Sequence, residues 1–327
     1  MNRQIDSALA RTLAGPLAKF ADPDWTATGE PRARVALRAL ETLWFNTGTL
    51  CNIECRHCYI LSSPTNDALV YLTCPEVESY LDEIAALGLA TREIGFTGGE
   101  PFMNPEIIAM TQAALERGFE VLILTNAMRP MMRPRLRKGL AGLAARFGGR
   151  LVLRVSLDHY TARRHDAERG PGGFETTLEG MRWLRDAGLR LAVAGRTIWG
   201  EDEAAARAGY GALFAAEGFA IDAMNPVQCV LFPEMDESAQ VPEITTACWG
   251  LLGKSPGSVM CASARMVVKR RGAARPAVLA CTLLAYDPRF ELGATLAEAT
   301  SGPGGEVALN HPHCAKFCVL GGASCSG

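Results

Sequence analysis

The chain has 327 residues, of which 48% are hydrophobic and 21% are charged, and its formal net charge at pH 7 is −2. This length suffices for one large domain, or for one domain with a small addition, and the balanced charge gives no electrostatic reason for nucleic-acid binding. The sequence has neither a signal-peptide core near its start nor an apolar run long enough to span a membrane. We therefore expect a cytoplasmic protein with no nucleic-acid or membrane partner.

Residues 1–40 show a short amphipathic pattern and are expected to form an N-terminal helical segment. Beyond them, short apolar runs alternate with helical patterns. The runs are apolar at most positions, as strands that are buried on both faces tend to be. They predict strands at residues 43–47, 92–96, 120–124, 150–157, 190–195 and 219–224.

Helix signals separate these strands. Thr73, Pro75 and Glu76 form a capping box with proline in the first turn, and Gly88 ends the helix that they begin. Strands that are each followed by a helix form a parallel sheet with the helices outside. We therefore predict an α/β fold, a partial (β/α)6 TIM-like barrel over residues 41–230. A closed eight-stranded barrel is the alternative.

Residues 231–327 are richer in proline, glycine and cysteine than the rest of the chain. Within them, two apolar runs at residues 264–270 and 276–281 are joined by a turn that contains glycine, which predicts a hairpin. We expect a small, Cys-rich C-terminal α+β extension.

Eleven cysteines fall into an early group, a late group and three scattered positions. Cytosolic thiols stay reduced, so clustered cysteines favour metal binding or redox chemistry over disulfides. The early group, Cys51, Cys55 and Cys58, has the spacing C-x3-C-x2-C. Three thiolates at this spacing can hold an iron–sulfur cube and leave one iron without a protein ligand. A zinc site completed by His57 or by a remote cysteine is the alternative.

Polar motifs follow the next three predicted strands: TGGEP at residues 97–101, LTNAM at 124–128 and VSLDH at 155–159. The carboxyl ends of parallel strands meet at one edge of a sheet, where such sheets bind ligands. In this order, and with CNIECRHCY at residues 51–59, the motifs resemble those of the radical S-adenosylmethionine (radical SAM) enzymes over about residues 43–225.

The resemblance implies that the early cysteines hold a 4Fe-4S cluster, whose open iron is chelated by the methionyl group of S-adenosylmethionine (SAM). It implies further cofactor contacts, namely Tyr59 near the adenine, Gly98, Gly99 and Glu100 at the methionyl amino group, Asn126, Ser156 and Asp158 at the ribose or methionyl part, and Arg196 at the carboxylate. Helix capping or surface pairing is the alternative role for Ser156, Asp158 and Arg196. In this family the reduced cluster cleaves SAM to a 5′-deoxyadenosyl radical, which abstracts hydrogen from a substrate.

The late cysteines and the hairpin resemble the twitch or SPASM-type extension of the same superfamily, which carries auxiliary iron–sulfur clusters. The resemblance implies one auxiliary 4Fe-4S cluster, because the spacing departs from the full seven-cysteine pattern. The candidate ligands are Cys261, Cys281, Cys314, Cys318 and Cys325. Cys229 and Cys248 are further ligands or buried thiols, and Cys74 is expected to be a core thiol. A structural zinc site is the alternative for this region.

Relatives with such extensions include peptide maturases and small-molecule dehydrogenases. We therefore expect an oxidoreductase or maturase-type enzyme that modifies a peptide or a small-molecule natural product, with an electron donor of the flavodoxin or ferredoxin type. About 40 residues precede the first strand, too few for a peptide-recognition domain, so a maturase would use a separate recognition protein. The alternatives are a twitch-type dehydrogenase or epimerase of small molecules, and a non-catalytic iron–sulfur electron carrier. No residue is assigned as a catalytic acid or base.

Overall fold

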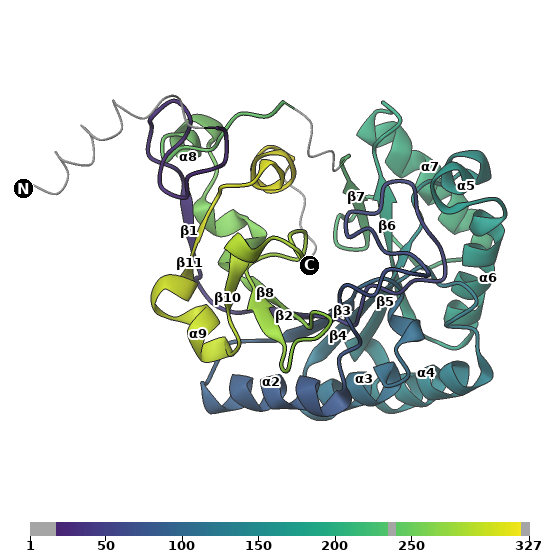
Figure 1. Cartoon of the computed structure of the whole chain (residues 1–327). Helices are drawn as coiled ribbons and strands as arrows, with labels where there is room; N and C mark the ends of the chain where they lie inside the picture. Colours follow the sequence, from purple (N-terminus) through teal and green to yellow (C-terminus); the bar gives the residue numbers. More distant parts are fainter. Residues whose placement is uncertain (1–17, 235–239, 322–327) are drawn as a thin grey trace, which may run out of the picture.

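A computed structural model describes residues 18–234 and 240–321, in which helices pack along the outer side of a large sheet (Figure 1). Nine strands of the described chain pair in the order β10-β9-β8-β2-β3-β4-β5-β6-β7. Neighbours from β8 to β7 in this order are parallel, whereas β9 and β10 are antiparallel additions at one edge. The bounds are β2 (Thr42–Asn46), β3 (Glu93–Thr97), β4 (Glu120–Thr125), β5 (Leu151–Ser156), β6 (Arg190–Arg196), β7 (Cys229–Phe232), β8 (Ala264–Val268), β9 (Ala277–Leu279) and β10 (Glu291–Gly293). A separate pair joins β1 (Arg34–Ala36) to β11 (Glu306–Ala308).

The helices alternate with the parallel strands. Their bounds are α2 (Cys74–Ala86), α3 (Ile107–Glu116), α4 (Pro134–Phe147), α5 (Ala162–Arg169), α6 (Gly173–Asp186) and α7 (Glu203–Glu217), followed in the C-terminal part by α8 (Cys248–Leu252) and α9 (Leu296–Thr300). Short 3-10 segments are η1 (Pro101–Met103), η2 (Gly148–Arg150), η3 (Pro256–Ser258), η4 (Met260–Ala262), η5 (Pro288–Phe290) and η6 (Gly302–Gly305), and η7 (Cys314–Leu320) is a π-helix. The predicted capping box is present at the start of α2, because the Thr73 hydroxyl accepts from the Glu76 N–H and the Glu76 carboxylate accepts from the Thr73 N–H.

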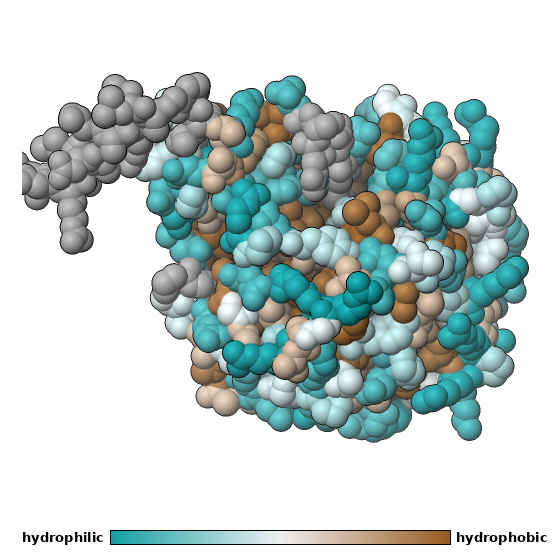
Figure 2. All heavy atoms as spheres, viewed as in Figure 1, coloured by the Kyte–Doolittle hydropathy of each residue, from teal (hydrophilic) through white to brown (hydrophobic). Residues whose placement is uncertain are grey.

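Alternate residues of each parallel strand face opposite sides of the sheet, and this alternation separates the core from the site. In β5, Leu153 and Val155 are fully buried in the core that the helices share with the sheet. Burial of such side chains stabilises the fold by about 1.5–3 kcal/mol each. Arg154 and Ser156 face the inner side of the sheet, where both line cavities. In the view of Figure 2, hydrophobic residues gather near the middle of the face and hydrophilic residues dominate its rim.

The predicted strand at residues 219–224 is wrong. These residues form a loop and turns, and the sixth parallel strand is β7, which begins five residues later. The Asp222 and Asn225 side chains accept hydrogen bonds from the backbone N–H groups of Met224 and Val227, which fixes turns there. Ile221 is nevertheless buried. Its apolar side chain is therefore explained by burial in a loop, and a short apolar run in a sequence does not distinguish a buried loop from a buried strand.

The predicted hairpin is present as β8 and β9, in which Val267 lies opposite Val278. Because β8 also pairs with β2 in parallel, the C-terminal residues continue the same sheet. Residue 230, where we place the domain boundary, lies within β7. The division into residues 41–230 and 231–327 therefore stays a prediction.

The described strands form an open sheet that ends at β10 and β7, so the partial barrel is confirmed and no closed barrel is found among them. Residues 1–17 of the predicted N-terminal helical segment, residues 1–40, lie outside the described residues, and the described residues 18–40 contain strand β1 and no helix. In the described residues, every helix is too short or too polar to cross a membrane.

Candidate functional site

A cavity of about 130 Å³ lies at the carboxyl ends of the parallel strands. The last residues of β3, β5, β6 and β7 line it, together with the loop that follows β2. Its lining includes most of the residues that the sequence singled out: Cys51, Cys55, Cys58, Tyr59, Gly98, Gly99, Asn126, Ser156, Asp158 and Arg196. Separate segments of the chain thus bring the three early cysteines and seven of the eight predicted cofactor contacts to one enclosure.

The loop that carries the cysteines is held at its middle by the end of α5. The Arg56 N–H donates to the carbonyl of Glu168 at 2.9 Å, and the His57 ring Nδ1 lies 2.7 Å from the Glu168 carboxylate. Arg196, at the end of β6, donates from Nη2 to the carbonyl of His57 at 2.8 Å. His57 is therefore engaged in bracing the loop.

Gly98 and Gly99 let the turn after β3 pass directly against the chain that leads into the cysteine loop. Gly98 has a φ of +137°, a conformation that favours glycine. A Cβ on Gly99 would lie 2.3 Å from the carbonyl oxygen of Leu50. The Gly99 and Glu100 N–H groups donate to the carbonyls of Gly48 and Leu50 at 2.8 and 3.1 Å. The glycines therefore serve a close backbone approach, and two of the amides in this turn are already used.

Glu100 does not line the cavity, and its carboxylate is occupied by neighbouring groups. It accepts hydrogen bonds from the N–H groups of Phe102 and Asn126 at 3.1 and 2.8 Å and from the Thr125 hydroxyl at 2.9 Å. Burial raises the pKa of Glu100 to about 7, although these three hydrogen bonds oppose the shift. In this structure the residue ties the end of β3 to the end of β4, and its contact with a methionyl ammonium stays a prediction.

Asp158 is buried and forms ion pairs with two arginines. It accepts from Arg169 Nε at 2.7 Å, from Arg169 Nη2 at 3.0 Å and from Arg196 Nε at 3.3 Å. Burial acts to raise the pKa of Asp158, but the two guanidinium groups overcome this effect and hold the pKa below its usual range. Within the described residues, Nη1 of Arg196 is buried and has no hydrogen-bond partner. That nitrogen is available to an anionic group in the cavity.

Arg169 is a cavity residue that the sequence analysis missed. It is the last residue of α5, and no motif marks it, because its distance from Asp158 along the chain has no meaning outside the folded structure. Burial raises the pKa of Cys55, and the positive charge of Arg169 opposes this shift. Arg169 therefore places a cation beside a thiol that must be deprotonated to bind metal.

Asn126 joins the end of β4 to the cysteine loop. Its Nδ2 donates to Asn52 Oδ1 at 2.9 Å, and its Oδ1 accepts from the Met128 N–H at 2.9 Å. Burial raises the pKa of Cys51 to about 12. The thiol is therefore protonated at neutral pH in this state, and metal binding would release its proton.

Late cysteines line a second, small enclosure of about 20 Å³. Cys261, Cys281, Cys314 and Cys318 all line it, whereas Cys229 and Cys248 are absent from its lining. Cys325 lies outside the described residues. Arg265 donates to the carbonyl of Cys261 at 2.7 Å, and burial lowers its pKa to about 10 although Cys261 and Cys281 oppose the shift.

Within the described residues, no three His, Cys, Asp or Glu side chains lie close enough together to hold a single metal ion. The thiols of each group instead surround a cavity. Four-coordinate zinc brings its sulfur ligands within about 2.3 Å of one ion, whereas the ligands of an iron–sulfur cube bind different irons. The arrangement of the thiols therefore fits a cluster better than one ion.

Comparison with known proteins identifies the fold and the region of the site. Residues 45–203 match the radical SAM superfamily. The chain is 33% identical over 138 residues to AdoMet-dependent heme synthase of Methanosarcina barkeri, a match that covers 42% of this chain and 37% of that protein. It is 30% identical over 145 residues to the antilisterial bacteriocin subtilosin biosynthesis protein AlbA of Bacillus subtilis, covering 44% of this chain and 30% of that protein. The matches thus span about a third of the length of these relatives.

Among solved structures, anSMEcpe with bound AdoMet and the Cp18Cys peptide superposes with a TM-score of 0.58 and 13% sequence identity, and the match covers 81% of each chain. At this level of identity the likeness shows a shared fold.

Proposed function

Since residues 45–203 form a radical SAM domain, we propose that this protein reductively cleaves SAM at a 4Fe-4S cluster and abstracts hydrogen from a peptide substrate. The single observation that carries the proposal is the convergence of Cys51, Cys55 and Cys58 with Arg196 on one cavity. Three thiols supply one ligand fewer than a cube has irons. The buried Nη1 of Arg196 lacks a partner among the described residues and suits the carboxylate of a methionyl group.

When bound, the cluster supplies the electron that breaks the 5′ carbon–sulfur bond of SAM, giving methionine and a 5′-deoxyadenosyl radical that takes a hydrogen atom from the substrate. The electron comes from a donor of the flavodoxin or ferredoxin type. Asp158 fixes the Arg169 and Arg196 guanidinium groups, and Arg196 in turn holds the carbonyl of His57 in the cysteine loop. Leu124, Phe232 and Leu283 give the cavity apolar walls, which exclude water from a reactive intermediate.

The proposal of a peptide substrate is supported by the likeness to AlbA and to the peptide-bound structure of anSMEcpe. The likeness to heme synthase favours a second candidate, modification of a small molecule. Mass spectrometry of the products separates the two candidates. A supplied peptide changes mass if the substrate is a peptide, and it stays unchanged if the substrate is a small molecule.

We also propose that Cys261, Cys281, Cys314 and Cys318 hold one auxiliary 4Fe-4S cluster. The support is their position around one enclosure beside the buried guanidinium of Arg265, since a cation offsets part of the negative charge of thiolate ligands. Iron and sulfide per chain should fall by about four each in Cys281→Ala, the content of one cube. An unchanged iron content would contradict this assignment.

The experiment for the main reaction uses anaerobically reconstituted protein with dithionite and SAM. We expect release of 5′-deoxyadenosine by the wild type and none by Cys55→Ala. Cys74→Ala is the matched control, because Cys74 lies at the start of α2 and is absent from the lining of both cysteine enclosures. A reconstituted wild type that releases no 5′-deoxyadenosine would favour the electron-carrier alternative.

A further inference from the structure

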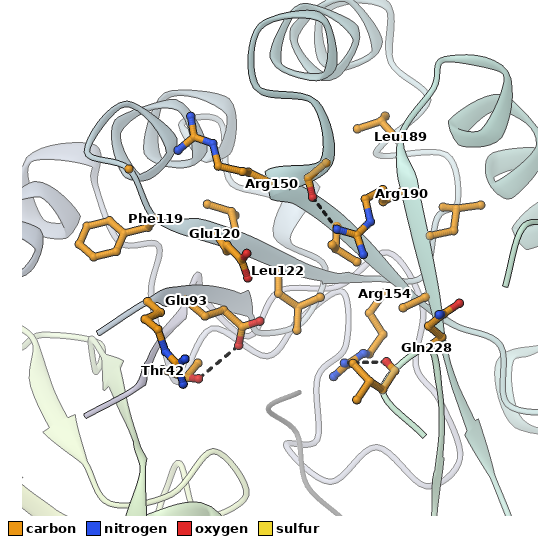
Figure 3. Close-up of a pocket in the computed structure, with 18 of the residues that line it drawn as sticks. Thr42, Glu93, Phe119, Glu120, Leu122, Arg150, Arg154, Leu189, Arg190 and Gln228 are labelled. Carbon is orange, nitrogen blue, oxygen red and sulfur yellow. Dashed lines mark hydrogen bonds between the residues drawn. The ribbon is translucent and has the colours of Figure 1, made fainter. Parts of the chain in front are cut away.

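A large hollow lies at the opposite end of the strands from the cysteines. It has a volume of about 1090 Å³, and Figure 3 shows it with 18 of the residues that line it. Thr42, Glu93, Glu120 and Arg190, the first residues of β2, β3, β4 and β6, form its rim. Nothing in the reaction proposed above uses this hollow.

Opposite charges face each other across this hollow. Figure 3 shows the Arg190 guanidinium on the side of β6 and the Glu93 and Glu120 carboxylates on the side of β3 and β4. Arg190 donates from Nη1 to the carbonyl of Gly149 at 2.9 Å, and Glu93 accepts from the Thr42 hydroxyl at 3.2 Å. In the described part of the chain, none of the three charged groups takes part in an ion pair. The hollow therefore presents charges of both signs that are not paired with each other.

Arg154 connects this hollow to the cysteine cavity. It is 4% exposed, and it is the residue that both linings share. It lies on β5 two residues before Ser156, which lines the cysteine cavity. Burial raises the pKa of Glu93, and the positive charge of Arg154 opposes this shift. The Arg154 charge therefore also interacts with a carboxylate of the hollow. A ligand that fills the hollow would thus reach the wall of the proposed reaction site.

The volume indicates the kind of ligand. Sites for small molecules measure about 300–1,000 Å³, and this hollow, at about 1090 Å³, exceeds that range. Its apolar floor includes Leu122 and Val152 between the two charged sides. A peptide segment with a carboxylate, a cationic group and an apolar side chain between them matches all three features.

We propose that this hollow binds a peptide segment of the substrate that carries both a carboxylate and a cationic side chain, with Arg190 holding the carboxylate and Glu120 the cation. The inference rests on the proposed function, because the bound segment would belong to the peptide that the proposed reaction modifies, and Arg154 lines both cavities. An arginine can hold a carboxylate with two parallel hydrogen bonds, and the Glu120 carboxylate can accept from an ammonium or guanidinium group.

The probe is a library of random heptapeptides, selected on anaerobically reconstituted wild-type protein. We expect the selected peptides to combine Asp or Glu with Lys or Arg. The tightest peptide should bind Arg190→Ala about 10- to 100-fold more weakly, the range for loss of a charge-assisted hydrogen bond. Arg271→Ala is the control and should bind as the wild type does, because Arg271 is 69% exposed and pairs with Asp67 outside the hollow.

A double-mutant cycle decides whether Arg190 holds the carboxylate itself. Replacing the acidic residue of the peptide by its amide should weaken wild-type binding as much as Arg190→Ala does, with no further loss when both changes are combined. Additive losses, or selected peptides without acidic residues, would overturn the proposal. If Arg190→Ala does not fold, Arg190→Gln keeps the aliphatic stem and takes its place. Release of 5′-deoxyadenosine by the wild type without peptide tests the proposed function separately, so that failure of either is recognised on its own.

Discussion

At the wall of the cysteine cavity, the Asp158 carboxylate accepts two hydrogen bonds from the Arg169 guanidinium, from Nε at 2.7 Å and from Nη2 at 3.0 Å. Only 4% of the Asp158 side chain and 10% of the Arg169 side chain are exposed. A pair this deeply buried has lost most of its hydration. It lies where the end of β5, the end of α5 and the cysteine loop meet. This pair therefore connects the stability of the domain to the geometry of its site.

Asp158→Asn should destabilise the protein, because it leaves the Arg169 charge buried without its counter-ion. Loss of one partner of a buried pair costs about 3–5 kcal/mol. Because the folded pKa of Asp158 is lowered, its contribution is fully present above about pH 4, where the unfolded carboxyl is ionised, and is lost as the pH falls further. Urea unfolding of the cluster-free protein from pH 7 to pH 3 measures the difference between wild type and variant. A difference that does not shrink below pH 4 would contradict the assignment.

Gly99→Ala should disrupt the contact between the β3 turn and the cysteine loop. Its Cβ would lie 2.3 Å from the Leu50 carbonyl oxygen, so the backbone must move, at a cost of about 1–3 kcal/mol or more. We expect a lower melting temperature and a smaller iron content after reconstitution. Gly142→Ala in α4 is the matched control, since a Cβ there meets nothing within 4 Å. That change should stabilise the helix by about 0.5–1 kcal/mol, and equal losses in both variants would refute the explanation.

Glu100→Gln should remove one component of the pH dependence of stability. The folded pKa of Glu100 is about 7, and the unfolded value is about 4.3. Between these values the folded state binds more protons, so the Glu100 contribution to the free energy of unfolding falls as the pH rises, by about 4 kcal/mol in total. The amide also costs a pH-independent amount, because its NH2 group faces a backbone donor. The slope of the wild-type-minus-variant difference in the cluster-free protein is therefore the readout, and a flat difference would contradict the shifted pKa.

Replacement of the early cysteines should separate metal binding from folding. Cys58→Ala should lose about four irons per chain, because a cube with two remaining thiolates is poorly held. The melting temperature of the cluster-free protein should change little, because Cys58 is only partly buried. If Cys58→Ala keeps its iron while Cys74→Ala loses it, the assignment of the early group is wrong. Iron and sulfide analysis with thermal melts of both variants measures the two effects.

Much of the fold follows from local pattern. Five of the six predicted strands are present in order as β2 to β6, because each is a short apolar run between helix signals that the neighbouring residues themselves provide. The exception at residues 219–224 shows the limit of this reasoning. Phe219 is buried in the core that contains Phe214 of α7, and a loop that is buried in this way has the same apolar composition as a strand.

The sequence alone determined which residues stand at the carboxyl ends of the parallel strands, because the strand pattern and the motifs that follow it are both local. The tertiary structure decided which groups are still available there: Glu100 is occupied by Phe102, Thr125 and Asn126, Arg169 arrives from the far end of α5, and four late cysteines from separate segments meet around one enclosure. It also decided that the charged residues at the starts of β3, β4 and β6 line one hollow. Hydrogen-bond occupancy and burial depend on residues that are distant along the chain, and no spacing in the sequence records them.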